Sequence, residues 1–164
     1  MDRSLYEDDI YAWTEQQAGA LRRLLDRPGR VPNELDLEHV AEEIEDLGRS
    51  ERHAAESAIR LILAHLIKLI AAPDSPAVRH WRKEIVSFQI DLLSRLTPSM
   101  AGRIDMDRLW HLARREARAG LDEDEAVEVP TDLWTLARCP IDLTTLAADE
   151  LDLDGALGQL RPLS

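Results

Sequence analysis

The segment 36–72 restricts the possible folds more than any other part of the sequence, because it contains no proline and only one glycine, Gly48. Apolar residues recur along it every three or four positions, which is the period of an α-helix that packs against a partner. They are Leu37, Val40, Ile44, Leu47, Ala54, Ala58, Leu61 or Ile62, and Leu69. One unbroken helix of this length reaches about 55 Å, which is long for a domain with a radius of gyration of about 15 Å. We therefore expect a kink or two helices at Gly48.

Capping signals predict further helices on both sides of this segment. A helix over 5–25 would begin with Ser4 as its cap and Glu7 completing a capping box. The next would begin at Ser75, with Pro76 in its first position, and a similar start signal recurs at Thr97. A fourth helix is expected over 105–119, and a short helical turn over 142–148.

The apolar pattern gives the fold class. No run of alternating β-branched residues is present, so the sequence predicts an all-α protein. We expect one domain over 1–164, built as an antiparallel helical bundle of four to five main helices. Its core would lie within 5–120, with an irregular acidic C-terminal segment, 121–164, packed on it.

The charge balance argues against several classes of partner. Lys and Arg number 20 against 32 Asp and Glu, which gives a formal net charge of −12. A protein of this charge is not expected to bind nucleic acid, because such binding depends on cations that neutralise phosphates. The acidity is uneven, with 1–72 and 121–164 acidic and 73–120 mildly basic. We expect these parts to neutralise one another within the fold, including Arg114, Arg115 and Arg118 by residues 122–125.

Three observations favour the cytoplasm. The longest apolar stretch, 58–72, contains Arg60 and Lys68 and is too short to cross a bilayer, so no membrane association is expected. The N-terminus has no basic and apolar run of the kind found in signal peptides. A lone Cys139 excludes an internal disulfide framework and is expected to be a poorly activated thiol.

Carboxylates and histidines are the candidates for a chemical site. His39 and Glu43 are spaced by four residues, which places both side chains on one helical face and makes them weak metal candidates. Glu42 points away from the apolar stripe, whereas Glu51 falls close to it. A carboxylate near the core must be paired, hydrogen-bonded or protonated, and the sequence offers Arg79, Arg82 and Lys83 as partners for Glu51.

The remaining candidates are expected to serve packing. His65 lies near the apolar stripe, where a histidine is usually hydrogen-bonded within the core or at its rim. Trp81 and the other three tryptophans come from separate segments, and each is expected to hold its segment on a common core. No glycine-rich phosphate loop and no Gly-x-Ser-x-Gly turn occurs. The sequence therefore predicts no catalytic residue, no metal ligand set and no cofactor.

Several motifs resemble a known family. YEDDIYAWTEQQAGALR, DLEHVAEEIEDLGRSER, LAHLIKL, HWRKEI, TPS and CPIDLTTL occur in the order seen in the bacterial family called domain of unknown function 29. The resemblance spans about residues 6–146, and its most specific part is EEIEDLGRSER. It implies an all-helical fold and no known activity. The chain departs from the family pattern after Pro140, where Ile141 and Asp142 replace an aromatic residue and Ser or Thr.

Besides small-ligand binding in an apolar pocket near Trp81, two functional hypotheses remain from the sequence. The first is a non-enzymatic, cytoplasmic protein-interaction module, whose partner would be another protein or a second copy of the chain. The second is a metal-binding helical-bundle enzyme or sensor that uses helix carboxylates and His39 or His65. Convergence of Glu43, Glu51 and His65 on one cleft would favour the second hypothesis.

Overall fold

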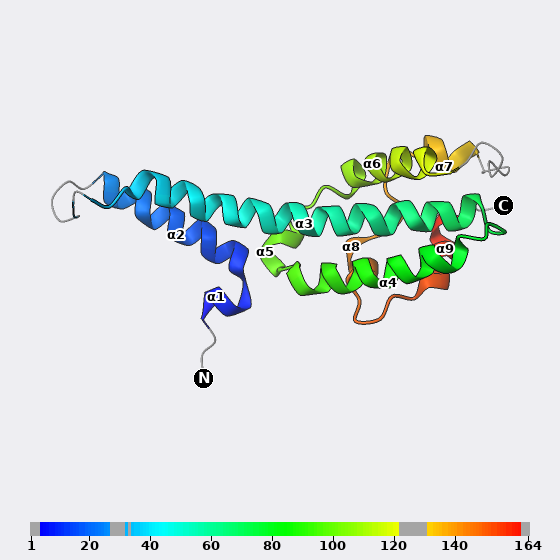
Figure 1. Ribbon diagram of the computed structural model, residues 1–164, viewed down its shortest axis with the longest axis horizontal. Helices are drawn as coiled ribbons and strands as arrows, with labels where there is room; N and C mark the ends of the chain where they lie inside the picture. The colour runs from blue at the N-terminus through cyan, green and yellow to red at the C-terminus, as the bar shows by residue number, and fades with distance from the viewer. Residues whose placement is uncertain (1–3, 27–31, 33, 122–130, 162–164) are drawn as a thin grey trace. The chain divides into compact units, whose positions relative to one another are not determined.

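The chain is all-helical, as predicted. The structure, a computed structural model, describes residues 4–26, 32, 34–121 and 131–161, and these ranges contain no strand. The helices are α1 Leu5–Asp8, α2 Ile10–Leu25, α3 Leu37–Ala71, α4 Val78–Arg95, α5 Pro98–Ala101, α6 Met106–Ala119, α7 Thr131–Thr135, α8 Leu143–Leu146 and α9 Leu153–Leu160 (Figure 1). Among these described helices, none is long and apolar enough to cross a membrane.

The chain divides into two compact units. Residues 1–54 and 95–103 form the first unit, and residues 55–94 and 104–164 form the second. The division falls within α3, which contributes residues to both. The prediction of one domain over 1–164 stays a prediction.

The first unit contains α1, α2, the N-terminal half of α3, and α5. The single helix expected over 5–25 is divided into two. The first helix ends at Asp8, and the second begins at Ile10 after the non-helical Asp9. The predicted capping box is wrong, since Ser4 occupies the cap position of α1 without a side-chain hydrogen bond. Asp9 caps α2 instead by accepting a hydrogen bond from the backbone N–H of Ala12.

Asp9 also ties α2 to α5. Its carboxylate accepts hydrogen bonds from the backbone N–H of Ser99, at 3.0 Å, and from the Ser99 hydroxyl, at 2.6 Å. Burial raises the pKa of the Asp9 carboxyl, but the hydrogen bonds from Ser99 and Ala12 outweigh burial and hold the pKa below its ordinary value. Asp9 therefore joins the N-termini of two helices as a buried anion.

The second unit is built around the C-terminal half of α3. The side chains of Ile59, Ile62, Leu63, Leu66 and Ile67 are fully buried there. Figure 1 shows α4 and α6 running beside this half of the helix, and polar contacts confirm both neighbours. The imidazole of His65 contacts Glu84 of α4, and the guanidinium of Arg108 of α6 donates to Glu56 at 2.7 Å.

The C-terminal segment contains more helix than the single turn expected there. The predicted turn is α8, which follows Asp142, and the structure adds α7 and α9. Polar contacts join this segment to α4 and α6. The Gln89 side-chain amide donates a hydrogen bond to the carbonyl oxygen of Ala148 at 2.8 Å. The Trp110 indole N–H donates one to the carbonyl oxygen of Leu136 at 2.9 Å. Buried Ala156, Leu157 and Leu160 belong to α9.

Two of the helices expected after α3 begin where they are predicted, and one begins later. Asp105 caps α6 by accepting from the N–H of Arg108, and Pro98 takes the first position of α5. The Ser75 hydroxyl accepts from the N–H of Ala77, but this contact holds a turn and α4 begins only at Val78.

Candidate functional site

Helix α3 continues through Gly48 without interruption from Leu37 to Ala71, so the expected division into two helices is wrong. The glycine serves close packing instead. A Cβ atom at Gly48 would lie 2.3 Å from the Thr14 hydroxyl oxygen and 3.2 Å from the Thr14 Cβ. Thr14 is itself buried, and its hydroxyl donates to the Tyr11 carbonyl oxygen at 2.7 Å. Gly48 therefore allows the Thr14 side chain of α2 to pack directly against the backbone of α3.

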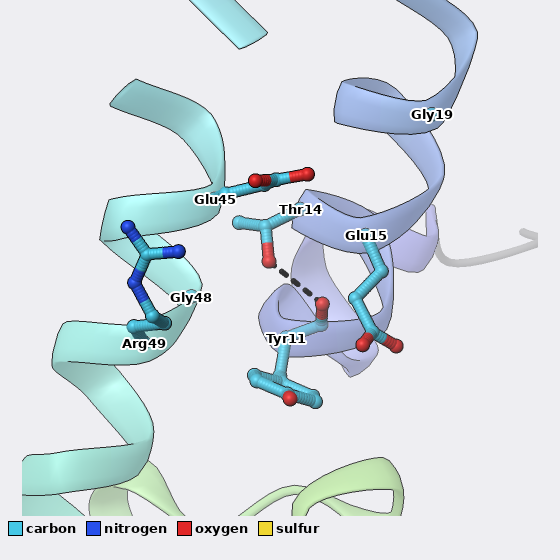
Figure 2. A pocket seen from close by; sticks show the side chains of 7 residues that line it. All are labelled: Tyr11, Thr14, Glu15, Gly19, Glu45, Gly48 and Arg49. Carbon is cyan, nitrogen blue, oxygen red and sulfur yellow. Dashed lines mark hydrogen bonds between the residues drawn. The ribbon is translucent and has the colours of Figure 1, made fainter. Parts of the chain in front are cut away.

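An open furrow follows one side of this contact (Figure 2). It has a volume of about 340 Å³, and its walls come from α2 and α3. The lining residues are Tyr11, Thr14, Glu15, Gly19, Glu45, Gly48 and Arg49. The two carboxylates already have partners, because Glu15 pairs with Arg103 and Glu45 with Arg22. The furrow is therefore lined by polar residues, and its two carboxylates are already paired with arginines.

The opposite side of the same two helices is apolar. Along α3, Ala41 and Gly48 are buried and mark the line of contact with α2, and successive residues turn by about 100°. Glu45 and Arg49 fall on one flank of that line, beside the furrow, and Val40, Ile44 and Leu47 fall on the other. On α2 the line of contact runs through Tyr11 and Ala18. By the same reasoning, Glu15 and Gly19 lie beside the furrow. Leu21, Leu24 and Leu25 lie on the other flank of that line.

We call these six residues, Leu21, Leu24, Leu25, Val40, Ile44 and Leu47, the apolar face of the α2–α3 pair. Four of them are large side chains in contact with water: Leu24 is 48% exposed, Leu25 46%, Leu47 43% and Val40 37%. Leu21 and Ile44 are half-buried. The apolar period predicts that Val40 and Leu47 face a partner helix, whereas both side chains are exposed. On α3 the contact is made at the small residues Ala41 and Gly48, and Val40 and Leu47 lie beside it.

The predicted metal candidates do not assemble into a site. His39 is exposed, and its Nδ1 lies 2.5 Å from the Asp36 carboxylate. The hydrogen bond with Asp36 raises the pKa of the imidazole and lowers that of the carboxyl. Glu42 and Glu43 are exposed on α3. Over the described part of the chain, no group of three or more His, Cys, Asp or Glu side chains could hold a metal ion.

Glu51 is paired, but with a different cation from those expected. Its Oε2 accepts a hydrogen bond from the Arg95 guanidinium at 3.0 Å, and both side chains are partly exposed. Arg79, Arg82 and Lys83 were the expected partners, and none of them contacts Glu51. The cation comes instead from the last residue of α4.

His65 occupies a separate, buried environment. Its side chain is 8% exposed, with Nδ1 2.8 Å from the Leu61 carbonyl oxygen and Nε2 2.8 Å from the Glu84 carboxylate. The ring of Phe88 packs against it, and the exposed His80 reaches the same carboxylate at 3.3 Å. Glu43 is exposed, Glu51 lies against Arg95, and His65 lies against Glu84. Each of the three residues whose convergence would favour an enzyme therefore has its own local environment.

The tryptophans and the lone cysteine have structural environments. Trp81 and Trp110 are buried in the second unit, whereas Trp13 and Trp134 are half-buried. Trp13 lies in the first unit, edge-on to Tyr6. Burial raises the pKa of the Cys139 thiol to about 11, which agrees with the expectation of an unreactive thiol.

The arginines of α6 gather around Trp134. A small pocket of about 120 Å³ is lined by His111, Arg114, Arg115, Arg118 and Trp134. The guanidiniums of Arg114 and Arg118 lie over the rings of Trp110 and Trp134, at 5.8 and 5.9 Å. The residues expected to neutralise these arginines, 122–125, lie outside the described residues.

Helix α4 carries a second exposed stripe, which sequence analysis did not identify. Its buried side carries Trp81, Ile85 and Leu92. On the opposite side Val86 is 55% exposed, Ile90 62% and Leu93 38%. Arg82, which the sequence suggested as a partner of Glu51, is exposed on this side. The full stripe, which we call the α4 face, consists of Arg79, Arg82, Lys83, Val86, Ile90 and Leu93.

Comparison with known proteins agrees with the predicted family. No curated protein matches the chain. A crystal structure at 1.45 Å resolution of an alpha-helical protein of unknown function from Rhodospirillum rubrum is similar to it, with 36% sequence identity and a TM-score of 0.87. The alignment covers 98% of this chain and 100% of the other. Residues 5–149 match the model of the family described as domain of unknown function DUF29. With most of its length matched by that model, the chain belongs to the DUF29 family.

Proposed function

We propose that the chain is a non-enzymatic protein-interaction module of the bacterial cytoplasm, and that it binds an amphipathic helix of a partner protein. The observation that carries this proposal is the apolar face of the α2–α3 pair. Two antiparallel helices that present apolar residues on one shared side form a surface on which a third helix can pack. Soluble proteins rarely leave such a face open unless a partner covers it.

The arrangement of titratable groups supports binding in preference to chemistry. Glu15, Glu45, Glu51 and His65 each lie against a specific local partner, as described above. An acid–base or metal site instead needs several such groups to converge on one reacting atom. The second hypothesis, a metal-dependent enzyme or sensor, therefore has no supporting geometry in the described residues. Elemental analysis of protein purified without chelator tests it, and we expect well under one equivalent of transition metal.

The binding proposal is tested with variants of the exposed residues. Leu24→Ser combined with Leu47→Ser removes apolar area from the face without creating a cavity, because both side chains are already in contact with water. Leu136→Ser is the matched control, since Leu136 is 41% exposed in the second unit. Circular dichroism of all three proteins should show the same helical content.

The measurement has two steps. Wild-type protein and both variants are used as bait in a bacterial lysate, and a captured protein is then purified and titrated against each bait. We expect binding by the wild type and by Leu136→Ser, with at least a tenfold loss for the double variant, which corresponds to about 1.4 kcal/mol. Equal affinity for all three baits, or no specific binding together with a strictly monomeric chain, would overturn the proposal.

A further inference from the structure

The α4 face combines apolar and cationic groups in one stripe. Its residues follow one another at intervals of three or four positions, except for the adjacent pair Arg82 and Lys83, so they share one side of the helix. The three cations lie toward the N-terminus of α4 and the three apolar residues toward its C-terminus. Arg79, Arg82 and Lys83 are exposed, and no described residue pairs with any of them.

On the α4 face, three cations have no partner among the described residues although carboxylates are in excess. Acidic residues exceed basic ones by twelve, so carboxylates are available to pair with every arginine and lysine. Other cations of the chain are paired in this way, for example Arg22, Arg95 and Arg108. Three cations left free beside three exposed apolar side chains indicate a surface that is complemented by acidic groups from outside the chain.

The apolar face of the α2–α3 pair has the complementary character. Glu43 lies one turn from both Val40 and Leu47, is exposed, and has no partner among the described residues. Residues 37–54 of α3 contain six acidic and two basic residues, whereas α4 contains four basic and two acidic ones. One surface is therefore apolar with acidic neighbours, and the other is apolar with basic neighbours.

We propose that the chain self-associates, with the α4 face of one copy seated on the apolar face of the α2–α3 pair of a second copy. This inference rests on the proposed function, because it identifies a second copy as one occupant of the same face. Helix α4 would supply the third helix, Val86, Ile90 and Leu93 would cover the exposed leucines, and Lys83 would approach Glu43. Such a contact joins two different surfaces and is heterologous.

The net charge determines the conditions of the experiment. Two chains of net charge −12 repel each other at long range, whereas the complementary faces attract only when they touch. At about 0.15 M salt the Debye length is about 8 Å, so the long-range repulsion is screened and the local contact remains. Sedimentation equilibrium of the full chain at this ionic strength, over a wide range of protein concentration, measures the association.

We expect the weight-average mass of the wild type to rise above that of one chain with concentration. Ile90→Ser and Leu47→Ser should each weaken association at least tenfold, while Leu136→Ser should leave it unchanged. A wild type that stays monomeric at every concentration, or association that is insensitive to Ile90→Ser, would overturn the inference.

Charge reversal provides a second test, which does not depend on apolar area. Glu43→Lys should weaken self-association, because lysine would face the cations of the α4 face. The double variant Arg82→Glu with Lys83→Glu should do the same from the other side. Mixing these two proteins restores opposite charges between the two substituted sites, and also between the native Glu43 of one variant and the native Arg82 and Lys83 of the other. We therefore expect the mixture to associate more strongly than either protein alone. A mixture that associates no better than its components would contradict the proposed pairing.

These outcomes distinguish failure of this inference from failure of the proposed function. Self-association that depends on Leu47 but not on Ile90 would reject the α4 face and retain the apolar face as a binding surface. The same conclusion would follow if the chain stays monomeric but captures another protein in a way that depends on Leu24 and Leu47. Loss of both behaviours would reject both proposals.

Discussion

Replacing Asp9 with alanine should destabilise the first unit by more than the loss of an ordinary helix cap. The carboxylate accepts three hydrogen bonds, from the backbone N–H groups of Ala12 and Ser99 and from the Ser99 hydroxyl. A lost N-cap costs about 1 kcal/mol, and a lost hydrogen bond to a buried charged group about 1.5 kcal/mol. Because Asp9 is only 8% exposed, we expect Asp9→Ala to cost about 3 to 4 kcal/mol.

Urea unfolding followed by circular dichroism measures this cost, and Asp105→Ala is the matched control. Asp105 caps α6 through one hydrogen bond, to the N–H of Arg108, so its loss should cost about 1 kcal/mol. A double-mutant cycle with Ser99→Ala should give a coupling energy of about 1 to 2 kcal/mol between Asp9 and Ser99. An equal cost for the two aspartates, with no coupling to Ser99, would refute the reasoning.

The dependence of folding stability on pH tests the same role of Asp9 without a substitution at Ser99. Its pKa in the folded chain lies below the ordinary value of 3.8, so its stabilising contribution is fully present above that value. The contribution is lost as the pH falls through the folded pKa, where the carboxylate becomes protonated. The difference in stability between the wild type and Asp9→Asn should therefore shrink as the pH is lowered below 3.8. A difference that grows on acidification would contradict this assignment.

Three further predictions concern packing and reactivity. Gly48→Ala should cost about 1 to 3 kcal/mol in urea unfolding, because the new methyl group meets Thr14, and adding Thr14→Ala should recover part of that loss. The Cys139 thiol, with a pKa of about 11, should react with a colorimetric disulfide reagent far more slowly in the native chain than in urea; equal rates would contradict its burial. Glu84→Ala should cost about 1 to 3 kcal/mol, because the buried His65 loses its acceptor, and Glu84→Gln should cost less in the same unfolding assay.

Local signals predicted much of the helical layout. Asp105 accepts a hydrogen bond from an N–H three residues later, and the fixed backbone angle of Pro98 suits the first position of a helix. Both starts depend on local residues, so the sequence alone can indicate them. The boundary at Asp9 was missed, because Ser4 and Glu7 offer a competing capping box a few residues earlier. The structure favours Asp9 because Ser99, far along the chain, supplies two further donors to its carboxylate.

The candidate surfaces were harder to predict, because they depend on which neighbour covers each side of a helix. Periodicity placed Val40 and Leu47 on an apolar stripe, but the partner helix packs on the flank that contains Ala41 and Gly48, since small residues permit the closest approach. The partner of Glu51 was misassigned for a related reason. Several cations follow it in the sequence, and only the fold brings Arg95, 44 residues away, to the carboxylate.

The central claim is that the apolar face of the α2–α3 pair is covered by a partner, and site-specific photocrosslinking tests it most directly. A photoreactive amino acid is placed at Leu47, on that face, and in a second protein at Glu42, which is equally accessible on another side of α3. Irradiation in a bacterial lysate, and of the purified chain at high concentration, should give adducts from position 47 and few from position 42. Equal adducts from both positions, or none from position 47, would contradict the claim.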